Sequence, residues 1–206
     1  MKTADVVAWN ETNKADVLRR AVAVWNRGGL VVIPTDTVYG LAADPRSAEA
    51  EAKLWTVKGR GLEKKIALLA ADPAAVRRVA SRFDEAAQRL AKAFWPGPLT
   101  LVLPTPGGTE GFRVPDDPVA LALLRAAGGL LRVTSANRSG AAPALTAADA
   151  IQALGDEVDL IVDAGPARGG VPSTVVAVQE SGLKILREGA LGSDEIRNAA
   201  GLAYHE

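Results

Sequence analysis

A short apolar segment that runs directly into a polar stretch is the feature that most restricts the fold of this chain. Leu30-Val31-Val32-Ile33 lies between Gly28-Gly29 and Pro34, a pattern typical of a buried strand. The next residues, Thr35-Asp36-Thr37-Val38-Tyr39, carry hydroxyl and carboxylate groups and end at Gly40. Polar groups at the end of a buried strand favour the sheet edge where open α/β proteins bind ligands. The alternative is a Thr/Asp-rich turn that caps its own backbone.

Helical and strand patterns alternate along the whole chain. Residues 12–27 carry apolar side chains at helical spacing. Five residues occupy positions typical of helix N-caps: Ser47, Asp72, Asp84, Asp117 and Thr146. Further strands are predicted at Ile66–Ala70, Leu99–Leu103, Leu130–Thr134, Leu160–Asp163, Ser173–Val178 and Leu183–Arg187. This alternation predicts an α/β fold.

The connections between these elements indicate how the chain is organised. Gln179–Gly182 joins the last two strands as a predicted hairpin, which favours a mixed sheet over a purely parallel one. Pro104–Gly111 is rich in glycine and proline and is predicted to be a mobile loop. Because no long linker or repeat interrupts the pattern, we expect a single domain over residues 1–206.

The composition excludes several kinds of active site. Cysteine is absent and His205 is the only histidine, so a thiol nucleophile, a Ser-His-Asp triad and Cys/His metal sites are excluded. Lys+Arg and Asp+Glu are equal at 24 each, which gives the chain no overall attraction to nucleic acid. The N-terminus lacks the pattern of a signal peptide and no apolar stretch approaches roughly 18 residues, so we expect a soluble, cytoplasmic protein without a membrane partner.

Basic and hydroxyl-bearing residues gather at the ends of predicted elements. Lys58-Gly59-Arg60 closes a helix and Lys64-Lys65 follow in the same loop, a grouping that suits a phosphate but also complements a helix dipole. Ser135–Gly140 follows a strand and is either a ligand-binding loop or an Asn/Ser-rich turn. Arg113 and Arg187 are further cations in such positions. Without a P-loop or a dinucleotide-binding glycine motif, the residues predict a cleft for an anionic small molecule and leave its reaction open.

Seven motifs occur in one order along the chain: Pro34–Leu41, Lys58-Gly59-Arg60, Trp95–Thr100, Arg113-Val114-Pro115, Ser135–Gly140, Ser173–Val176 and Leu186–Gly189. Their order and spacing resemble the YrdC/Sua5 family, the threonylcarbamoyl-AMP synthases. The resemblance implies an α/β, YrdC-like fold, in which a twisted mixed sheet flanked by helices surrounds an electropositive cavity. Because the chain ends soon after the last motif, it is similar to the short, single-domain form of the family.

The resemblance also implies an enzyme, an L-threonylcarbamoyladenylate synthase of the nucleotidyltransferase class. Such an enzyme converts L-threonine, bicarbonate and ATP into threonylcarbamoyl-AMP and pyrophosphate. Its product feeds formation of N6-threonylcarbamoyladenosine (t6A) in tRNA, which makes the threonylcarbamoyl transferase machinery an expected partner and direct binding of tRNA or other RNA a further one. ATP is expected as a substrate, accompanied by Mg²⁺, and no carboxylate cage for the metal is readable.

Individual residues take their expected roles from the matching motifs. Four residues match the catalytic motifs of the family, which are a pair of basic residues and a Ser-x-Asn pair: Lys58, Arg60, Ser135 and Asn137. The nucleotide contacts are expected to be Arg60, Lys64, Thr109, Ser135 and Arg187. The L-threonine contacts are expected to be Thr37, Arg113 and Ser173, with Thr35 and Tyr39 as neighbours. Arg113 suits the carboxylate of threonine because a guanidinium binds a carboxylate through two parallel hydrogen bonds.

One segment departs from the family pattern. After Lys-x-Arg the family commonly has proline, an asparagine near ATP and a histidine near threonine, whereas this chain has Gly61, Lys64 and Leu69 at those places. The departure leaves open a paralogue with the same fold that acts on another carbamoyl substrate, or that binds RNA without catalysis. The scarcity of aromatic residues, three Phe and two Tyr, argues against the RNA-binding alternative.

Overall fold

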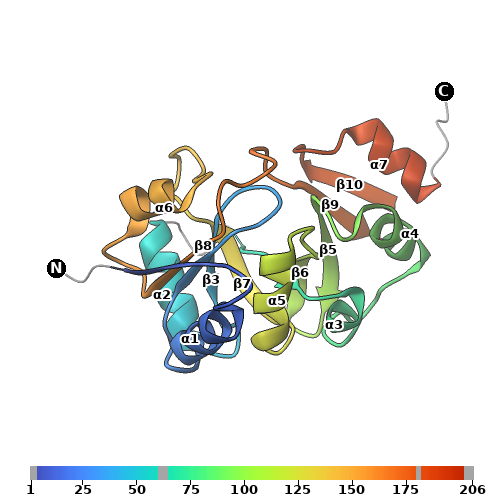
Figure 1. Cartoon of the computed structure of the whole chain (residues 1–206). Coiled ribbons are helices and arrows are strands. Elements are labelled where there is room, and N and C mark those ends of the chain that lie inside the picture. Colours follow the sequence, from blue (N-terminus) through green and yellow to red (C-terminus); the bar gives the residue numbers. More distant parts are fainter. Residues whose placement is uncertain (1–3, 60–64, 180–181, 202–206) are drawn as a thin grey trace.

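Figure 1 shows the computed structural model of the chain, which describes residues 4–59, 65–179 and 182–201. Within these residues, ten strands form one sheet in the order β1-β8-β2-β3-β7-β4-β6-β5-β9-β10. The strands are β1 (Asp5–Ala8), β2 (Val31–Ile33), β3 (Gly40–Ala43), β4 (Leu68–Ala70), β5 (Leu99–Thr105), β6 (Gly108–Arg113), β7 (Leu130–Ser135), β8 (Leu160–Asp163), β9 (Thr174–Gln179) and β10 (Gly182–Arg187). Parallel and antiparallel neighbours both occur, as β2–β8 and β2–β3 illustrate, so the predicted mixed sheet is confirmed.

Helices α1 to α6 begin within two residues of where the sequence predicts them, and α7 was not predicted. They are α1 (Lys14–Asn26), α2 (Ala48–Lys58), α3 (Pro73–Arg77), α4 (Glu85–Phe94), α5 (Pro118–Ala126), α6 (Ala147–Leu154) and α7 (Ser193–Ala200). All five predicted N-cap side chains accept a hydrogen bond from a backbone N–H of the first helical turn. Gly59, at a φ of +58°, ends α2 directly after Lys58 in a left-handed conformation that favours glycine. No helix in the described part of the chain is long and apolar enough to cross a membrane.

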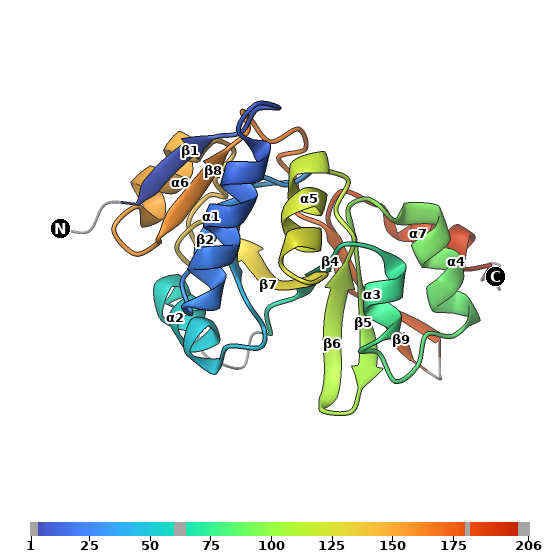
Figure 2. The same ribbon diagram turned by 60° about the horizontal axis from the view of Figure 1, so that its bottom comes forward.

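Alternating side chains divide the left half of the sheet into two packed faces. Val31 and Ile33 of β2 belong to the cluster that also contains buried residues of α1 and α5, whereas Val32 belongs to the cluster of α2 and α6. Because successive strand residues point to opposite faces, α1 and α5 cover one face and α2 and α6 cover the other. Figure 2 shows α1 and α5 side by side in front of the sheet.

The right half of the sheet is packed differently. Leu99, Leu101 and Leu103 of β5 lie in a cluster with Leu90 of α4 and Ile196 of α7. Figure 2 shows α3, α4 and α7 grouped at this end of the molecule. The residues of β5 between these leucines therefore point to the opposite face, where the cavity described below lies.

One sequence prediction is wrong, and several elements were missed. Pro104–Gly111 is not a loop: β5 continues to Thr105, β6 begins at Gly108, and Thr105 pairs with Gly108 in an antiparallel hairpin. The two residues between them make a tight turn. Four elements have no counterpart in the sequence prediction: β1, β3, β6 and α7. The predicted hairpin of β9 and β10 is confirmed as an antiparallel pair, and its residues 180–181 lie outside the described residues.

Candidate functional site

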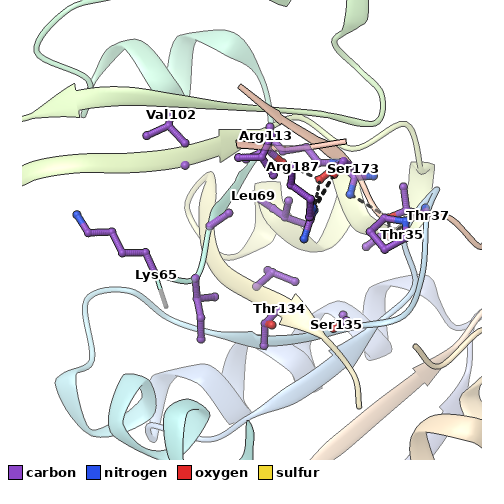
Figure 3. Close-up of a pocket in the computed structure, with 18 of the residues that line it drawn as sticks. Thr35, Thr37, Lys65, Leu69, Val102, Arg113, Thr134, Ser135, Ser173 and Arg187 are labelled. Atoms are coloured by element: carbon purple, nitrogen blue, oxygen red, sulfur yellow. Dashed lines mark hydrogen bonds between the residues drawn. The ribbon is translucent and has the colours of Figure 1, made fainter. Parts of the chain in front are cut away.

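A cavity of about 400 Å³ lies over the central strands, from β3 and β7 across β4, β6 and β5 to β9 and β10. The β2–β3 loop closes one end of it with Thr35, Thr37 and Val38. Figure 3 shows Arg113, Arg187 and Ser173 together near this loop, with Lys65 on the other side and Thr134 and Ser135 along the opposite wall. This volume lies within the range of about 300–1,000 Å³ that is common for small-molecule sites.

The charge of the lining is positive. Lys65, Arg113 and Arg187 line the cavity, and none of the described residues in its lining is acidic. Hydroxyl groups surround these cations: Thr35, Thr37, Thr100, Thr109, Thr134, Ser135 and Ser173. The lining therefore suits an anionic ligand that also carries hydrogen-bonding groups, as the sequence predicts.

Strand alternation explains why β5 contributes polar groups to the cavity. Thr100 and Val102 line it, while Leu99 and Leu101, which flank Thr100, face the core. Thr100 is only 5% exposed, and its hydroxyl lies 2.8 Å from the hydroxyl of Ser173. Thr100 was not among the predicted site residues. The polar residue within the apolar run Leu99–Leu103 was the signal that could have identified it.

Arg113 is the most fixed cation of the site. Its Nε donates to the Gly97 carbonyl oxygen (3.0 Å), Nη1 donates to Thr37 Oγ1 (2.9 Å), and Nη2 donates to Asp36 Oδ1. Burial lowers the pKa of Arg113, the Asp36 carboxylate opposes this effect, and the nearby Arg187 guanidinium lowers the pKa further. Asp36 was part of the predicted loop but was not assigned a role. Its pairing with a residue 77 positions away leaves no local signal.

Arg187 joins the same end of the cavity from β10. Its Nη2 donates to the Ser173 carbonyl oxygen (2.7 Å) and its Nε to the same oxygen (3.2 Å), and Nη2 also lies 3.3 Å from Ser173 Oγ. Ser173 Oγ in turn contacts Thr100. The structure therefore brings Arg187 together with Ser173 and Arg113, three residues that the sequence assigned to two different ligands.

Thr35 and Tyr39 shape the loop in different ways. The Thr35 hydroxyl donates to the Val38 carbonyl (2.6 Å) and accepts from the Thr37 and Val38 backbone N–H groups, so it fixes the turn. The Tyr39 side chain is buried, donates to the Gly165 carbonyl (2.6 Å), and is not in the cavity lining. Tyr39 therefore connects the loop to the chain after β8 and does not itself face a ligand in this structure.

Lys58 and Asn137 lie behind the cavity wall. The fully buried Lys58 ammonium donates to the carbonyl oxygens of Ser135 (2.7 Å) and Asn137 and to Asn137 Oδ1 (3.1 Å). Asn137 Nδ2 donates to the carbonyl oxygen of Ala141 (2.6 Å). Of the Ser-x-Asn pair and its lysine, only Ser135 lines the cavity. Lys58 and Asn137 thus hold the turn that presents Ser135.

The mouth of the cavity carries the last of the predicted residues. Thr109 lines it, and Lys65 Nζ donates to the Thr109 carbonyl oxygen (2.6 Å). Lys65 was not assigned a ligand from the sequence. Arg60 and Lys64, which were, lie outside the described residues. Leu69 also lines the cavity, and on the adjacent strand its Cα partner is Arg113, so an apolar side chain lies beside that guanidinium.

The sequence of this chain is similar to a described protein family and to its curated members. The family model Sua5_yciO_yrdC, described as "Telomere recombination", matches residues 23–189. A putative threonylcarbamoyl-AMP synthase of Mycobacterium tuberculosis (strain H37Rv) is 36% identical over 192 residues, which cover 88% of this chain and 88% of that one.

Solved structures are also similar to this chain. Pyrococcus abyssi Sua5 complexed with L-threonine is 31% identical with a TM-score of 0.89, and the match covers 97% of this chain and 61% of that chain. Escherichia coli YciO is 25% identical with a TM-score of 0.83 and is covered over its full length, with 95% of this chain matched. The chain thus spans about three fifths of Sua5 and all of YciO. The expected YrdC-like fold is confirmed.

Proposed function

Because this chain belongs to the Sua5/YciO/YrdC family, we propose that it is an L-threonylcarbamoyladenylate synthase. It joins L-threonine, bicarbonate and ATP into threonylcarbamoyl-AMP with release of pyrophosphate. The observation that carries this proposal is the cavity lined by cations and hydroxyls, in a chain whose relative Sua5 has been solved with L-threonine. The product then serves t6A formation in tRNA through a threonylcarbamoyl transferase.

The amino-acid end of the cavity is formed by Arg113, Thr37 and Ser173. Arg113 commits three of its five N–H groups to described residues, so two remain for the carboxylate of threonine. Ser173 and Thr37 place hydroxyls beside that carboxylate. Thr35, which also lines the cavity, and Tyr39, which does not, both fix the loop that carries Thr37.

The nucleotide end is formed by Ser135, Thr109 and Lys65, at the mouth and along the opposite wall. Arg60 and Lys64, which the family resemblance assigns to the nucleotide, lie outside the described residues. Arg187 lies toward the amino-acid end, close enough to Arg113 to lower its pKa. We infer that Arg187 contacts the bond-forming region, where carbamate and α-phosphate meet.

The chemistry requires positioning more than proton transfer. Bicarbonate takes up a proton and loses water to give CO₂. The neutral threonine amine adds to CO₂ and loses a proton to form a carbamate, and one carbamate oxygen then attacks the α-phosphorus while pyrophosphate leaves. Two anions must approach each other, so fixed cations lower the barrier by offsetting their repulsion. A site of arginine, lysine and hydroxyl groups is sufficient for this.

Mg²⁺ would enter with the ATP phosphates. In the described residues no group of three or more Asp, Glu, His or Cys side chains lies close enough together to hold a metal ion. No step above depends on a metal ion held by protein side chains.

The proposal is tested by following ATP, bicarbonate and L-threonine with two readouts, pyrophosphate release and threonylcarbamoyl-AMP mass. L-Serine, L-valine and no amino acid are the comparisons, because they measure how well a cavity lined by the apolar Leu69 selects the threonine side chain. We expect threonine-dependent adduct. Arg187→Ala should reduce it, whereas Arg19→Ala, in an exposed ion pair on α1, should not.

Absence of any adduct from folded protein that binds ATP would reject the synthase. Adduct formation only when carbamoyl phosphate replaces bicarbonate would instead assign the cavity to another carbamoyl substrate. Salt-sensitive RNA binding without turnover would favour the RNA-binding alternative.

A further inference from the structure

Asp36 is an acidic side chain bonded to a cation of the cavity lining, and the proposed function does not use it. Its carboxylate pairs with Arg113 Nη2, and both side chains are nearly buried, with exposures of 10% and 7%. Arg113 is held on two further sides by Gly97 and Thr37. A guanidinium bonded in three directions is fixed before any ligand arrives.

The ion pair also sets the charge of this end of the cavity. Asp36 offsets the positive charge of Arg113 and places a fixed negative charge beside it. A phosphate carries more negative charge than a carboxylate, so Asp36 repels a phosphate at this end of the cavity more strongly than it repels a carboxylate.

We propose that Asp36 is a positioning residue that reserves Arg113 for the carboxylate of the amino acid. Asp36 holds the guanidinium so that its two remaining N–H groups face the ligand, and its charge keeps phosphate groups from competing for them. This inference rests on the proposed function for the identity of the amino acid. The geometry of the pair does not depend on that function.

The kinetic test uses Asp36→Asn, which keeps the size of the side chain and removes its charge. We expect the threonine KM to rise about tenfold or more, because a charge-assisted hydrogen bond that orients Arg113 is lost. The ATP KM should change by less than about threefold. Inhibition by inorganic phosphate, competitive with threonine, should become stronger. Equal changes in both KM values, or unchanged phosphate inhibition, would overturn the proposal.

Two variants separate positioning from general destabilisation. Asp36→Glu retains the charge. Its phosphate inhibition should be as weak as in the unmodified protein, and its threonine KM should lie between those of the unmodified protein and Asp36→Asn. Asp44→Asn is the matched control: Asp44 has the same 10% exposure and is bonded to Arg46 (2.8 and 2.9 Å), but it does not line the cavity. It should leave both KM values unchanged. If Asp44→Asn reproduces the effects of Asp36→Asn, the role of Asp36 is only structural.

NMR of the Arg113 guanidinium does not require turnover, so it tests the role of Asp36 independently of the proposed function. In arginine-labelled protein, NMR detects whether the guanidinium of Arg113 rotates, with Arg113→Lys assigning its signal. We expect slow rotation in the unmodified protein and faster rotation in Asp36→Asn. An unchanged signal would refute the positioning role even if the enzyme is active, and slow rotation in a protein without threonine-dependent turnover would refute only the choice of amino acid.

Discussion

Tyr39→Phe should change how the stability of this protein depends on alkaline pH. Burial is the main cause that raises the pKa of the Tyr39 hydroxyl; the Ala164 N–H opposes it and nearby Asp163 and Asp117 add to it, so that together they raise the pKa to about 12. The unfolded chain has a tyrosine pKa of about 10. The folded protein thus favours the protonated hydroxyl, so this contribution to stability is complete below about pH 10 and is lost as the pH rises through about 12.

The size of the effect follows from the two pKa values. Two pH units correspond to about 2.7 kcal/mol in total, of which about 1.4 kcal/mol is lost by pH 11. Tyr39→Phe has no proton to lose. It should be less stable at pH 8 by about 1–1.5 kcal/mol, because the Gly165 carbonyl loses its 2.6 Å partner.

Urea unfolding at pH 8, 10 and 11 measures this difference. The gap between the unmodified protein and Tyr39→Phe should narrow by about 1.4 kcal/mol over that range. Titration of all other groups is common to both proteins and cancels, and Tyr204→Phe controls for loss of a tyrosine as such. Parallel stability curves would refute the argument, because they would show that Tyr39 ionises alike in the folded and unfolded chain.

Two further substitutions test the walls of the cavity. Lys58→Met should lower the free energy of unfolding by roughly 2–3 kcal/mol, because the oxygens of Ser135 and Asn137 lose a buried donor. Unchanged stability in urea would contradict the role of Lys58 in supporting this turn. Leu69→His should raise the preference for L-threonine over L-valine by about tenfold, because an apolar wall separates isosteric side chains poorly and a hydrogen-bonding one separates them well. Equal kcat/KM ratios in both proteins would place Leu69 away from the amino-acid side chain.

Elements with local chemical signals were predictable from the sequence, and strands that form mainly because neighbouring strands pair with them were not. The Asp117 cap and the β-branched run at Val31 act within a few residues, and both appear where expected. Gly40–Ala43 forms β3 although its residues favour strands weakly, since β2 and β7 bond to it on both sides. In Gly108–Arg113 the glycines resembled a loop, yet pairing with β5 makes a strand.

The site shows the same division between residue type and geometry. The motifs predicted that Thr37, Arg113 and Ser173 would gather, and they do. They did not predict which side chains would face the cavity: Lys58 supports the wall from behind. Asp36 is paired through a contact that only the folded chain creates. A motif identifies residues that act together, while burial and register determine which of them contact a ligand.

Backbone carbonyls orient the cations of this site. A carbonyl oxygen fixes the direction of a cation without cancelling its charge, and a cation that is already oriented loses less entropy when it binds an anionic ligand. Among the cations that line the cavity, such bonds hold Lys65 at Thr109, Arg113 at Gly97 and Arg187 at Ser173. Arg113 also has a carboxylate partner, Asp36, which reduces the positive charge that Arg113 presents to a ligand. We expect such a reduction where a cation must bind a carboxylate in preference to the phosphates that occupy the same cavity. The Asp36 variants measure this discrimination.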